Sequence, residues 1–376
     1  MIKRDIEHIL LKRWGKGKAI IVMGPRQTGK TTLLNKIALE KGKYLLLDCD
    51  ELIVREKLER ANLEDLKQLT GSYPIVFIDE AQRVKNIGLS LKIIIDQIKD
   101  IQLLVSGSSA LELANQINEP LTGRKWEYLL YPLSWQEIRK HFGYLTVQKQ
   151  LNQRLVFGMY PDVINNQGDE KAILKQLASS YLYKDLLSLA SIRKPDLLPK
   201  LLKALAFQIG NEVSLNELSN LLGVNKDTIA SYMDLLEKAF IIFRMEPFSR
   251  NIRNEIKSSR KIYFYDNGIR NAIISNYNSP EMRQDTGALW ENFLISERKK
   301  YLEYNEISAS SYFWRTAQKQ EIDYIEEREG KIFAFEFKWN PKAKAKIPKT
   351  FTNAYKVEPF IIHRDNFEQF VLSTPD

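Results

Sequence analysis

A glycine-rich stretch near the start of the chain has the residue types and the spacing of a phosphate-binding loop. It runs from Gly24 to Thr32, fits the pattern GxxxxGK[ST], and lies between an apolar run and a helical pattern. Backbone amides of such a loop surround a β-phosphate, while Lys30 would neutralise the β and γ charge and Thr31 would ligate Mg²⁺. The sequence therefore predicts a site for a nucleoside triphosphate with Mg²⁺. The residues predicted to bind it are Gly24, Pro25, Arg26, Gln27, Thr28, Gly29, Lys30, Thr31 and Thr32.

An acidic pair follows a second apolar run, Ile75 to Ile78. Asp79 would hold the Mg²⁺ through water, together with Thr31, and Glu80 would orient and deprotonate the attacking water. The alternative is a glycine loop followed by an unrelated acidic turn. Because both motifs follow strands of the right kind, we interpret them as one site that hydrolyses a nucleotide.

Serine and arginine side chains further along are additional candidates for the same site. Ser106 and Ser108 end another apolar run and could touch the γ-phosphate or the attacking water, although serines there are also ordinary turn and cap residues. Arg124 could reach the γ-phosphate of its own site or of a neighbouring copy as an arginine finger, or it could be an exposed arginine after a turn. Arg26, inside the loop, has the same two interpretations.

A second group of charged residues lies near the end of the chain, on two expected strands joined by a turn. Strand alternation puts Glu321 and Asp323 on one face of the first strand, and Glu336 and Lys338 on one face of the second. An acid opposite an ExK pattern is the arrangement of PD-(D/E)xK nucleases, in which Asp323 and Glu336 would hold Mg²⁺ or Mn²⁺ and Lys338 would activate water or stabilise the phosphate. Glu291, from the preceding helical pattern, would complete the metal shell. The alternative is a solvent-exposed face of ion pairs that binds nothing.

Alternating apolar runs and amphipathic stretches predict the elements that position the first site. The order of strand and helix in residues 1–131 is typical of a parallel sheet with helices on its faces. The expected strands are Ala19 to Met23, Tyr44 to Leu47, Ile75 to Ile78 and Gln102 to Val105, and the expected helices are Lys30 to Glu40 and Leu89 to Ile98.

The rest of the chain is first helical and then strand-rich. Ser214-Leu-Asn-Glu217 reads as a capping box, Gly223 as a turn and Asn225 as the cap of a second helix, followed by an apolar strand, so we expect a winged helix-turn-helix. Helices are expected at Leu133 to His141, Val147 to Phe157, Lys171 to Leu189, Leu197 to Ile209, Leu215 to Leu222 and Lys226 to Lys238. Strands are expected at Lys261 to Tyr265, Ser311 to Arg315, Ile322 to Ile325, Ile332 to Phe337 and Phe360 to Ile362.

The winged helix-turn-helix could contact DNA or could pack beside the ATPase core. Residues at the start of its second helix and arginines in or near the wing are where such folds place their DNA contacts. These residues are Lys226, Asp227, Thr228, Ser231, Arg244, Arg250 and Arg253. Asp227 and Asp234 weaken the positive charge of that face.

Bulk properties limit the class of protein. A chain of 376 residues with 44% hydrophobic and 27% charged residues should hold two or three globular domains. Its single cysteine, Cys49, excludes a disulfide scaffold and fits a reducing compartment. No apolar run approaches membrane-spanning length, so we expect a cytoplasmic protein with no membrane partner. The net charge of +9 attracts polyanions without identifying one.

These residues resemble a family of prokaryotic P-loop ATPases of the AAA+ superfamily. In it an ATPase domain precedes a winged helix and a restriction-endonuclease-like module of uncertain function. The resemblance implies ATP as the nucleotide, slow hydrolysis and an association with DNA. One departure is Met159, where the family has a second glycine after Gly158. The matching segments are Gly24 to Thr32, Ile75 to Gln82, Leu103 to Ser109, Gly123-Arg124, Tyr131 to Ser134, Gly158 to Asp162, Lys261 to Gly268, Gly287 to Glu297 and Tyr312 to Lys338.

The expected fold is α/β in four parts. These are a P-loop ATPase domain (1–131), a helical lid (132–194), a winged helix (195–265) and a small α/β restriction-endonuclease-like domain (266–376). Two functions follow. One is an ATP-hydrolysing switch that acts on DNA, with or without cleavage, and the other is a regulatory ATPase whose inactive nuclease fold binds a partner. The partners that we consider are ATP, DNA, a protein or a second copy of the chain.

Overall fold

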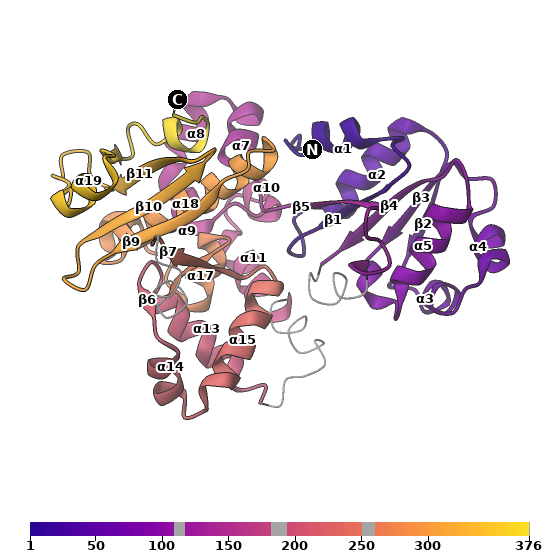
Figure 1. Ribbon diagram of the computed structural model, residues 1–376, viewed down its shortest axis with the longest axis horizontal. Coiled ribbons are helices and arrows are strands. Elements are labelled where there is room, and N and C mark those ends of the chain that lie inside the picture. Colours follow the sequence, from indigo (N-terminus) through magenta and orange to yellow (C-terminus); the bar gives the residue numbers. More distant parts are fainter. Residues whose placement is uncertain (109–116, 182–193, 250–259, 376) are drawn as a thin grey trace. The chain divides into compact units, whose positions relative to one another are not determined.

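The computed structural model describes residues 1–108, 117–181, 194–249 and 260–375. It divides the chain into two compact units. The first is Met1–Pro132 with Lys238–Phe240, and the second is Leu133–Glu237 with Ile241–Asp376. The fold is mixed α/β, with one sheet in each unit (Figure 1).

The first unit is built on a five-stranded parallel sheet in the order β2-β3-β4-β1-β5. Strands β1, β3 and β4 lie in its interior and are almost entirely buried, which explains why they appear in the sequence as uninterrupted apolar runs. The strands are β1 (Ala19–Met23), β2 (Tyr44–Asp48), β3 (Ile75–Asp79), β4 (Gln102–Gly107) and β5 (Lys125–Leu129). The four strands predicted here are confirmed, and β5 was not anticipated.

Helices complete this unit (Figure 1, indigo to purple). The apolar faces of α3, α4 and α5 contribute Leu58, Leu66 and Leu91 to a core shared with the strands. The helices are α1 (Glu7–Arg13), α2 (Lys30–Lys41), α3 (Leu52–Glu59), α4 (Leu63–Thr70) and α5 (Ile87–Gln97), with a short 3₁₀ turn at Ala81–Arg83. The two predicted helices, α2 and α5, are confirmed within two residues at each end.

The second unit contains a seven-stranded mixed sheet in the order β12-β11-β10-β9-β7-β8-β6. Strand β7 pairs antiparallel with β8 on one side and parallel with β9 on the other, so β7 and β8 belong to the same sheet as the C-terminal strands. The predicted division between residues 265 and 266 falls inside this sheet. The strands are β6 (Glu212–Val213), β7 (Ile242–Pro247), β8 (Arg260–Phe264), β9 (Ser310–Arg315), β10 (Glu321–Arg328), β11 (Lys331–Phe337) and β12 (Phe360–Ile362).

The helices of the second unit largely follow the apolar periodicity of the sequence. The expected helix from Val147 to Phe157 is divided at Gln150, whose amide bonds the carbonyl of Val147 (2.9 Å) in a tight turn. The expected helix from Lys171 to Leu189 is confirmed up to Tyr181, as α11 and a π-helical turn, Leu177–Tyr181; residues 182–189 lie outside the described ranges. The helices are α7 (Trp135–Phe142), α8 (Tyr144–Lys149), α9 (Leu151–Phe157), α10 (Pro161–Asn165), α11 (Glu170–Gln176), α13 (Leu197–Phe207), α14 (Leu215–Leu222), α15 (Lys226–Lys238), α17 (Asn267–Ile273), α18 (Thr286–Tyr304), α19 (Lys349–Tyr355) and α20 (Glu368–Val371), with a 3₁₀ turn at Pro280–Met282.

Candidate functional site

The phosphate-binding loop joins the carboxyl end of β1 to the start of α2. Gly24 has φ +147°, and a Cβ there would lie 2.2 Å from the carbonyl oxygen of Leu130, so only glycine fits. Gly29 caps α2 in the left-handed region at φ 92°. The Nζ atom of Lys30 donates to the carbonyl oxygens of Gly24 (2.9 Å) and Pro25 (2.8 Å), which places the ammonium inside the loop.

Arg4 fixes the loop from outside and was not anticipated from the sequence. Its guanidinium donates to the carbonyl oxygens of Thr28 (2.5 Å) and Tyr131 (2.7 Å), and the residue is buried. The Thr28 hydroxyl donates in turn to the Pro25 carbonyl (2.9 Å). The loop is therefore held by side chains as well as by its glycines.

Asp79, at the end of β3, lies beside Thr31 in the first turn of α2. Thr31 Oγ1 donates to Asp79 Oδ2 (2.9 Å), and the Ser106 hydroxyl donates to Asp79 Oδ1. Burial raises the pKa of the Asp79 carboxyl, and the hydrogen bonds from Ser106 and Thr31 offset only part of that rise. A buried carboxylate next to a hydroxyl is a set of hard oxygen donors whose charge a divalent cation would neutralise, so these residues fit Mg²⁺.

Glu80 is held in one orientation by two neighbours. Gln82 Nε2 and Ser108 Oγ both donate to Glu80 Oε2, at 2.5 and 2.9 Å, and Gln82 Nε2 also lies 3.0 Å from Ser108 Oγ. Burial pushes the pKa of Glu80 upward, but the Lys30 charge and these hydrogen bonds outweigh it and leave the pKa below its ordinary value. The carboxylate is therefore ionised at neutral pH and able to accept a proton from water.

Gln82 was assigned no role from the sequence and was noted only as the last residue of the segment Ile75 to Gln82 that resembles the ATPase family. Ser106 and Ser108 are brought to the site, as one of their two sequence interpretations required. Glu80 itself adopts φ 51°, which is uncommon for a residue with a side chain and directs its carboxylate toward Ser108. Ser109 lies outside the described residues.

Arg124 is not brought to the phosphate loop of its own chain. Its carbonyl accepts from the amide of Ala19, the first residue of β1, whereas the loop follows the last residue of that strand. Five strand residues span about 17 Å, and the Arg124 guanidinium is occupied by Asp96 (2.7 Å). The prediction that Arg124 serves its own site is wrong, and its action on a neighbouring copy stays a prediction.

The charged residues predicted near the C-terminus lie close together in the second unit. Lys338 Nζ donates to Glu336 Oε1 (2.6 Å), and the Phe337 amide donates to Asp323 Oδ2 (2.7 Å). Burial, and then the mutual repulsion of Asp323 and Glu336, raise the pKa of Asp323. Hairpin pairing of β10 with β11 is what aligns these side chains.

A lysine that the sequence did not suggest lies within this acidic cluster. The Nζ of Lys261, from β8, contacts Glu291 (3.0 Å) and Glu321, and its side chain is 2% exposed. The Tyr263 hydroxyl donates to Glu291 Oε1 (2.5 Å). Burial lowers the pKa of Lys261, but the charges of Glu291 and Glu321 outweigh it and leave the pKa above its ordinary value, so the ammonium is charged at neutral pH.

The charge of Lys261 affects whether the acidic cluster can bind a metal ion. No group of three or more Asp, Glu, His or Cys side chains in the described residues is arranged to bind a metal ion. The predicted shell of Glu291, Asp323 and Glu336 is therefore not formed, because Glu291 is turned to Lys261 and Tyr263. One oxygen, Glu336 Oε2, is buried without a hydrogen-bond partner. The residues as placed do not fit a metal centre.

The segment predicted to form a winged helix-turn-helix contains helices α14 and α15, and one of its two predicted caps differs from the prediction. Asn225 Oδ1 accepts from the Thr228 amide (2.8 Å), so the predicted cap of α15 is confirmed. Ser214 makes no side-chain cap bond, so the predicted capping box with Glu217 is wrong. Instead, the Glu217 carboxylate accepts from the Gln208 amide group (3.5 Å).

The charges of this segment are distributed unevenly. Lys226, Asp227 and Ser231 are exposed at the start of α15. Arg244 is not available in the same way, because it is bound by Asp234 (2.6 Å) and Glu237. Arg250 and Arg253 lie outside the described residues.

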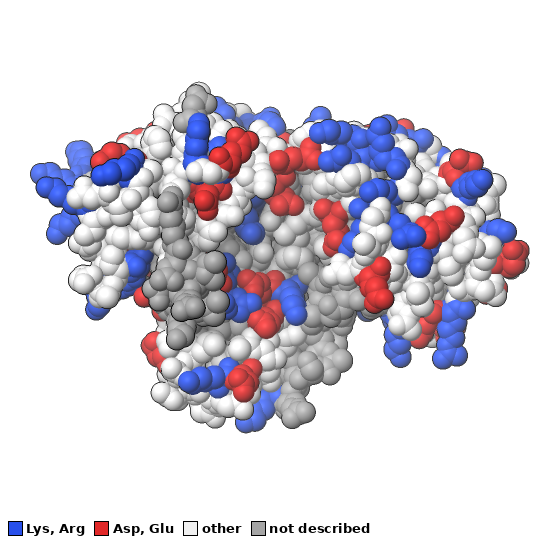
Figure 2. Space-filling model, viewed as in Figure 1, with Lys and Arg blue, Asp and Glu red and all other residues white. Residues whose placement is uncertain are grey.

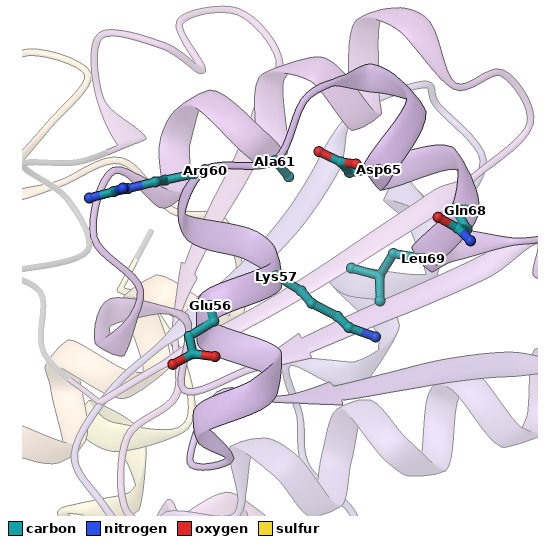
Figure 3. Close-up of a pocket in the computed structure, with 7 residues that line it drawn as sticks. All are labelled: Glu56, Lys57, Arg60, Ala61, Asp65, Gln68 and Leu69. Carbon is teal, nitrogen blue, oxygen red and sulfur yellow. The ribbon is translucent and has the colours of Figure 1, made fainter.

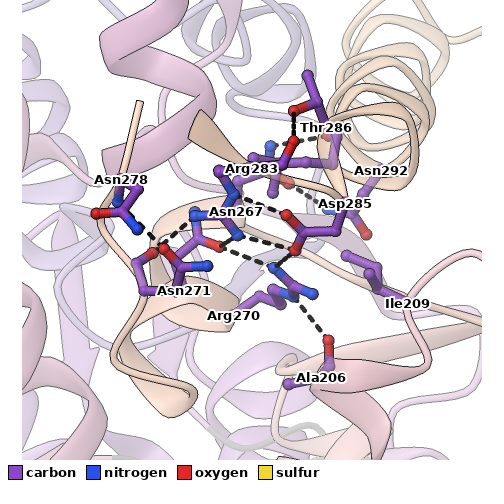
Figure 4. Close-up of polar contacts among 12 residues, drawn as sticks. Ala206, Ile209, Asn267, Arg270, Asn271, Asn278, Arg283, Asp285, Thr286 and Asn292 are labelled. Carbon is purple, nitrogen blue, oxygen red and sulfur yellow. Dashed lines mark hydrogen bonds and ion pairs between the residues drawn. The ribbon is translucent and has the colours of Figure 1, made fainter. Parts of the chain in front are cut away.

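Buried polar contacts join α13, α17 and the start of α18 within the second unit (Figure 4). Arg270 donates to the Ala206 carbonyl (2.7 Å) and to Asp285 Oδ2 (2.5 Å), and Arg283 donates to both carboxylate oxygens of Asp285. Although burial opposes it, this double pairing lowers the pKa of Asp285 to about 2. The contacts tie the last turn of α13 and helix α17 to the start of α18.

Met159, the departure from the family pattern, lies at a close junction with Asp266. Its amide donates to Asp266 Oδ2 (2.7 Å), and its side chain is buried. A Cβ on Gly158 would lie 2.1 Å from Asp266 Oδ1, and Gly158 has φ +73°. The junction therefore requires glycine at position 158 and accepts a larger residue at 159.

Comparison with known families divides the chain into three stretches. Residues 16–139 match a family described as AAA domain. Residues 148–280 and 286–373 match two domains of unknown function, DUF8612 and DUF4143. The first match covers the phosphate loop and the acidic pair, so the chain contains a P-loop domain of the ATPase type.

Several relatives match most of the chain, and each is itself an uncharacterised protein. One from Mycobacterium tuberculosis is 26% identical over 342 residues, covering 89% of this chain and 74% of the relative. One from Methanocaldococcus jannaschii is 26% identical over 353 residues (86% and 75%), and one from Haemophilus influenzae is 24% identical over 382 residues (94% and 88%).

Among solved structures, the Walker-type ATPase of Pyrococcus abyssi has a similar fold. Its TM-score is 0.52 at 15% identity, and the match covers 73% of this chain and 96% of that one. The likeness agrees with the parallel sheet and phosphate loop of the first unit. No helix in the described ranges combines the length and the apolar character that crossing a bilayer requires.

Proposed function

We propose that the first unit binds ATP with Mg²⁺ and hydrolyses it. The observation that carries this proposal is the convergence of Lys30, the Thr31–Asp79 pair and Glu80 at the carboxyl end of the sheet. The match to the AAA domain and the likeness to a Walker-type ATPase support adenine as the base.

Each of these residues has a distinct task in hydrolysis. The Lys30 ammonium, which donates to two loop carbonyls, would exchange them for phosphate oxygens. Thr31 and Asp79 would hold Mg²⁺, which when bound neutralises charge on the β and γ oxygens. Glu80, oriented by Gln82 and Ser108, accepts the proton of the attacking water.

Two substitutions test this assignment because they separate binding from chemistry. Lys30→Ala should abolish nucleotide binding, and Glu80→Gln should leave binding intact and reduce kcat by about 10²- to 10⁴-fold. Titration with a fluorescent ATP analogue and a phosphate-release assay measure the two effects. Lys57→Ala, an exposed lysine on α3, is the matched control. Wild-type hydrolysis by Glu80→Gln would show that another group is the base.

DNA is the partner that we propose for the second unit. A capped second helix with Lys226 and Ser231 exposed at its start, followed by a strand hairpin, supports a winged helix used in this way. The exposed loop lysines Lys342, Lys344 and Lys346 would add phosphate contacts.

The proposed DNA contact predicts salt-dependent binding to a duplex. Lys226→Glu combined with Ser231→Glu should weaken it by about tenfold or more at low salt, whereas charge changes on exposed Lys57 should not. Wild-type affinity in the double variant, measured by fluorescence anisotropy, would contradict this use of α15.

For the acidic cluster we propose a non-catalytic role, within a nuclease-like fold that serves as an interaction surface for a partner. The observation in favour is Lys261, whose ammonium pairs with Glu291, one of the three carboxylates predicted to hold a metal ion, and with the neighbouring Glu321. Wild-type protein with Mn²⁺ should leave plasmid and single-stranded DNA uncut. Cleavage that disappears in Asp323→Ala would instead establish a nuclease, and cleavage that persists would point to a contaminant.

A further inference from the structure

A groove lies at the amino ends of the strands in the first unit, at the edge of the sheet opposite the phosphate loop. Its volume is about 460 Å³, and it is bordered by the segment before β1, the starts of β3 and β4, and the last residues of α2 and α5. The residues that define its chemistry are Trp14, Lys18, Lys41, Lys99, Asp100 and Gln102. Nothing in the proposed ATP site uses them, since β1 separates the two by about 17 Å.

The groove carries an excess of positive charge. Three lysines, Lys18, Lys41 and Lys99, face one acid, Asp100, among its lining residues. Lys41 and Lys99 are exposed, and neither forms an ion pair with a carboxylate in the part of the chain that the structure describes. Lys16, in the adjoining Trp14–Lys18 loop, is exposed as well. Unneutralised ammonium groups around one groove favour a ligand with several negative charges.

The rings of Trp14 and Trp126 lie close to these basic side chains. Lys41 Nζ lies 5.8 Å from the ring of Trp14, which is half-buried in the groove. Next to it, Arg13 and Lys18 lie over the ring of Trp126, at 4.2 and 4.5 Å. A planar ring beside lysines provides a stacking surface for a base and counter-charges for phosphates.

Another groove of the same unit shows how specific this combination is. It lies between α3 and α4 and is lined by Glu56, Lys57, Arg60 and Asp65 among others, with two acids and two bases and no aromatic ring (Figure 3). Because its acidic and basic residues are equal in number, that groove favours neither an anionic nor a cationic ligand. By contrast, Lys and Arg side chains gather over α1 and α2, whose last turns carry Lys12, Arg13 and Lys41 (Figure 2).

We propose that this groove binds single-stranded nucleic acid, with a base against Trp14 and the backbone phosphates on Lys18, Lys41 and Lys99. A single strand is favoured over a duplex because only an unpaired base offers a free face to an aromatic ring in a groove of this size. An acidic polypeptide would satisfy the lysines but would leave the ring unused. The site is separate from the duplex contact proposed for α15, and it does not depend on ATP hydrolysis.

Charge reversal in the full-length protein tests the electrostatic part. Lys41→Glu with Lys99→Glu should weaken binding of a labelled 20-nucleotide thymidine strand by about tenfold or more at low salt, and should reduce the slope of log Kd against log salt by about 1 to 2. Lys57→Glu with Lys85→Glu changes the net charge equally at exposed positions outside the groove, and should alter Kd less than threefold. Equal losses in both double variants, or none in either, would overturn the proposal.

Photocrosslinking tests the location. A strand containing 5-iodouridine should crosslink to the peptide that carries Trp14, and the crosslink should disappear in Trp14→Leu and in the Lys41, Lys99 double variant but persist in Trp14→Phe. Crosslinks confined to other peptides would refute the site. Complete competition by polyglutamate at equal charge concentration would identify an acidic polypeptide as the ligand instead. ATPase activity without nucleic acid, measured alongside, should match the wild type in every groove variant.

Discussion

Gln82 gives the most direct test of how the first unit activates water. Its amide group donates to Glu80 Oε2 at 2.5 Å, and the residue is buried, so water cannot easily replace the bond in Gln82→Ala. A hydrogen bond to a charged group contributes about 1.5–3 kcal/mol. Because Ser108 still donates to the same oxygen at 2.9 Å, we expect the lower end of that range, which corresponds to a fall in kcat of about tenfold.

The same substitution should change the pH dependence of hydrolysis. The pKa of Glu80 lies below its ordinary value partly because Gln82 stabilises the ionised form. Without that bond the pKa rises, so the acid limb of the kcat profile should move to higher pH while the rate at pH 8 shows only the orientational loss. The affinity for ATP should not change, since Gln82 contacts neither the loop nor Thr31.

Steady-state phosphate release between pH 5 and 8, with a separate titration of a fluorescent ATP analogue, measures both effects. Gln97→Ala, at the exposed end of α5, is the matched control for removing a glutamine. Thermal unfolding should show that both variants are folded. An unchanged kcat and an unmoved acid limb in Gln82→Ala would refute the positioning role, as would a loss confined to ATP affinity.

Three further predictions concern the folded state. Gly158→Ala should lower the free energy of unfolding by about 3 kcal/mol, because its Cβ would lie 2.1 Å from Asp266 Oδ1 at a positive φ; an unchanged urea midpoint would contradict this geometry. Asp285→Asn should cost about 3 kcal/mol by leaving buried Arg270 without its carboxylate. Since the folded-state pKa of Asp285 is about 2, against an ordinary value near 4, its contribution is complete above about pH 4 and is lost as the pH falls through 2, so wild type and variant should converge in acid. Cys49 is buried, and burial raises its pKa to about 12, so thiol reagents at pH 8 should modify it in denaturant and leave the native protein unlabelled; rapid native labelling would show that the core opens there.

Local sequence patterns predicted much of the fold because the elements concerned are buried on particular faces. Interior strands of a parallel sheet contact helices on both sides, so β1, β3 and β4 had to be apolar throughout. Helices α3 and α4 were missed because each is only eight residues long and presents few buried residues. A capping motif alone did not predict the cap of α14. Ser214 makes no cap hydrogen bond, and the Glu217 side chain accepts a hydrogen bond from Gln208 instead.

The candidate sites were predictable only as far as their chemistry is local in sequence. Lys30, Thr31, Asp79 and Glu80 belong to short motifs that follow predictable strands. The residues that orient or neutralise the side chains of the two candidate sites do not belong to such motifs. Lys261 reaches Glu291 across 30 positions in the chain and Glu321 across 60, and no local pattern encodes such contacts. The acids of the predicted metal shell could be identified from local patterns, but Lys261, which pairs with one of them, Glu291, could not.

The parallel pairing of β7 with β9 restricts where the gene for this chain can be divided. Glu246 and Pro247 lie opposite Tyr312 and Phe313, so without β7 and β8 one edge of strand β9 would have no paired strand. A gene fragment beginning at residue 266 would encode a sheet with an open apolar border, prone to self-association. Recombination between related genes would preserve a stable product only where the crossover carries the hairpin and the C-terminal strands together.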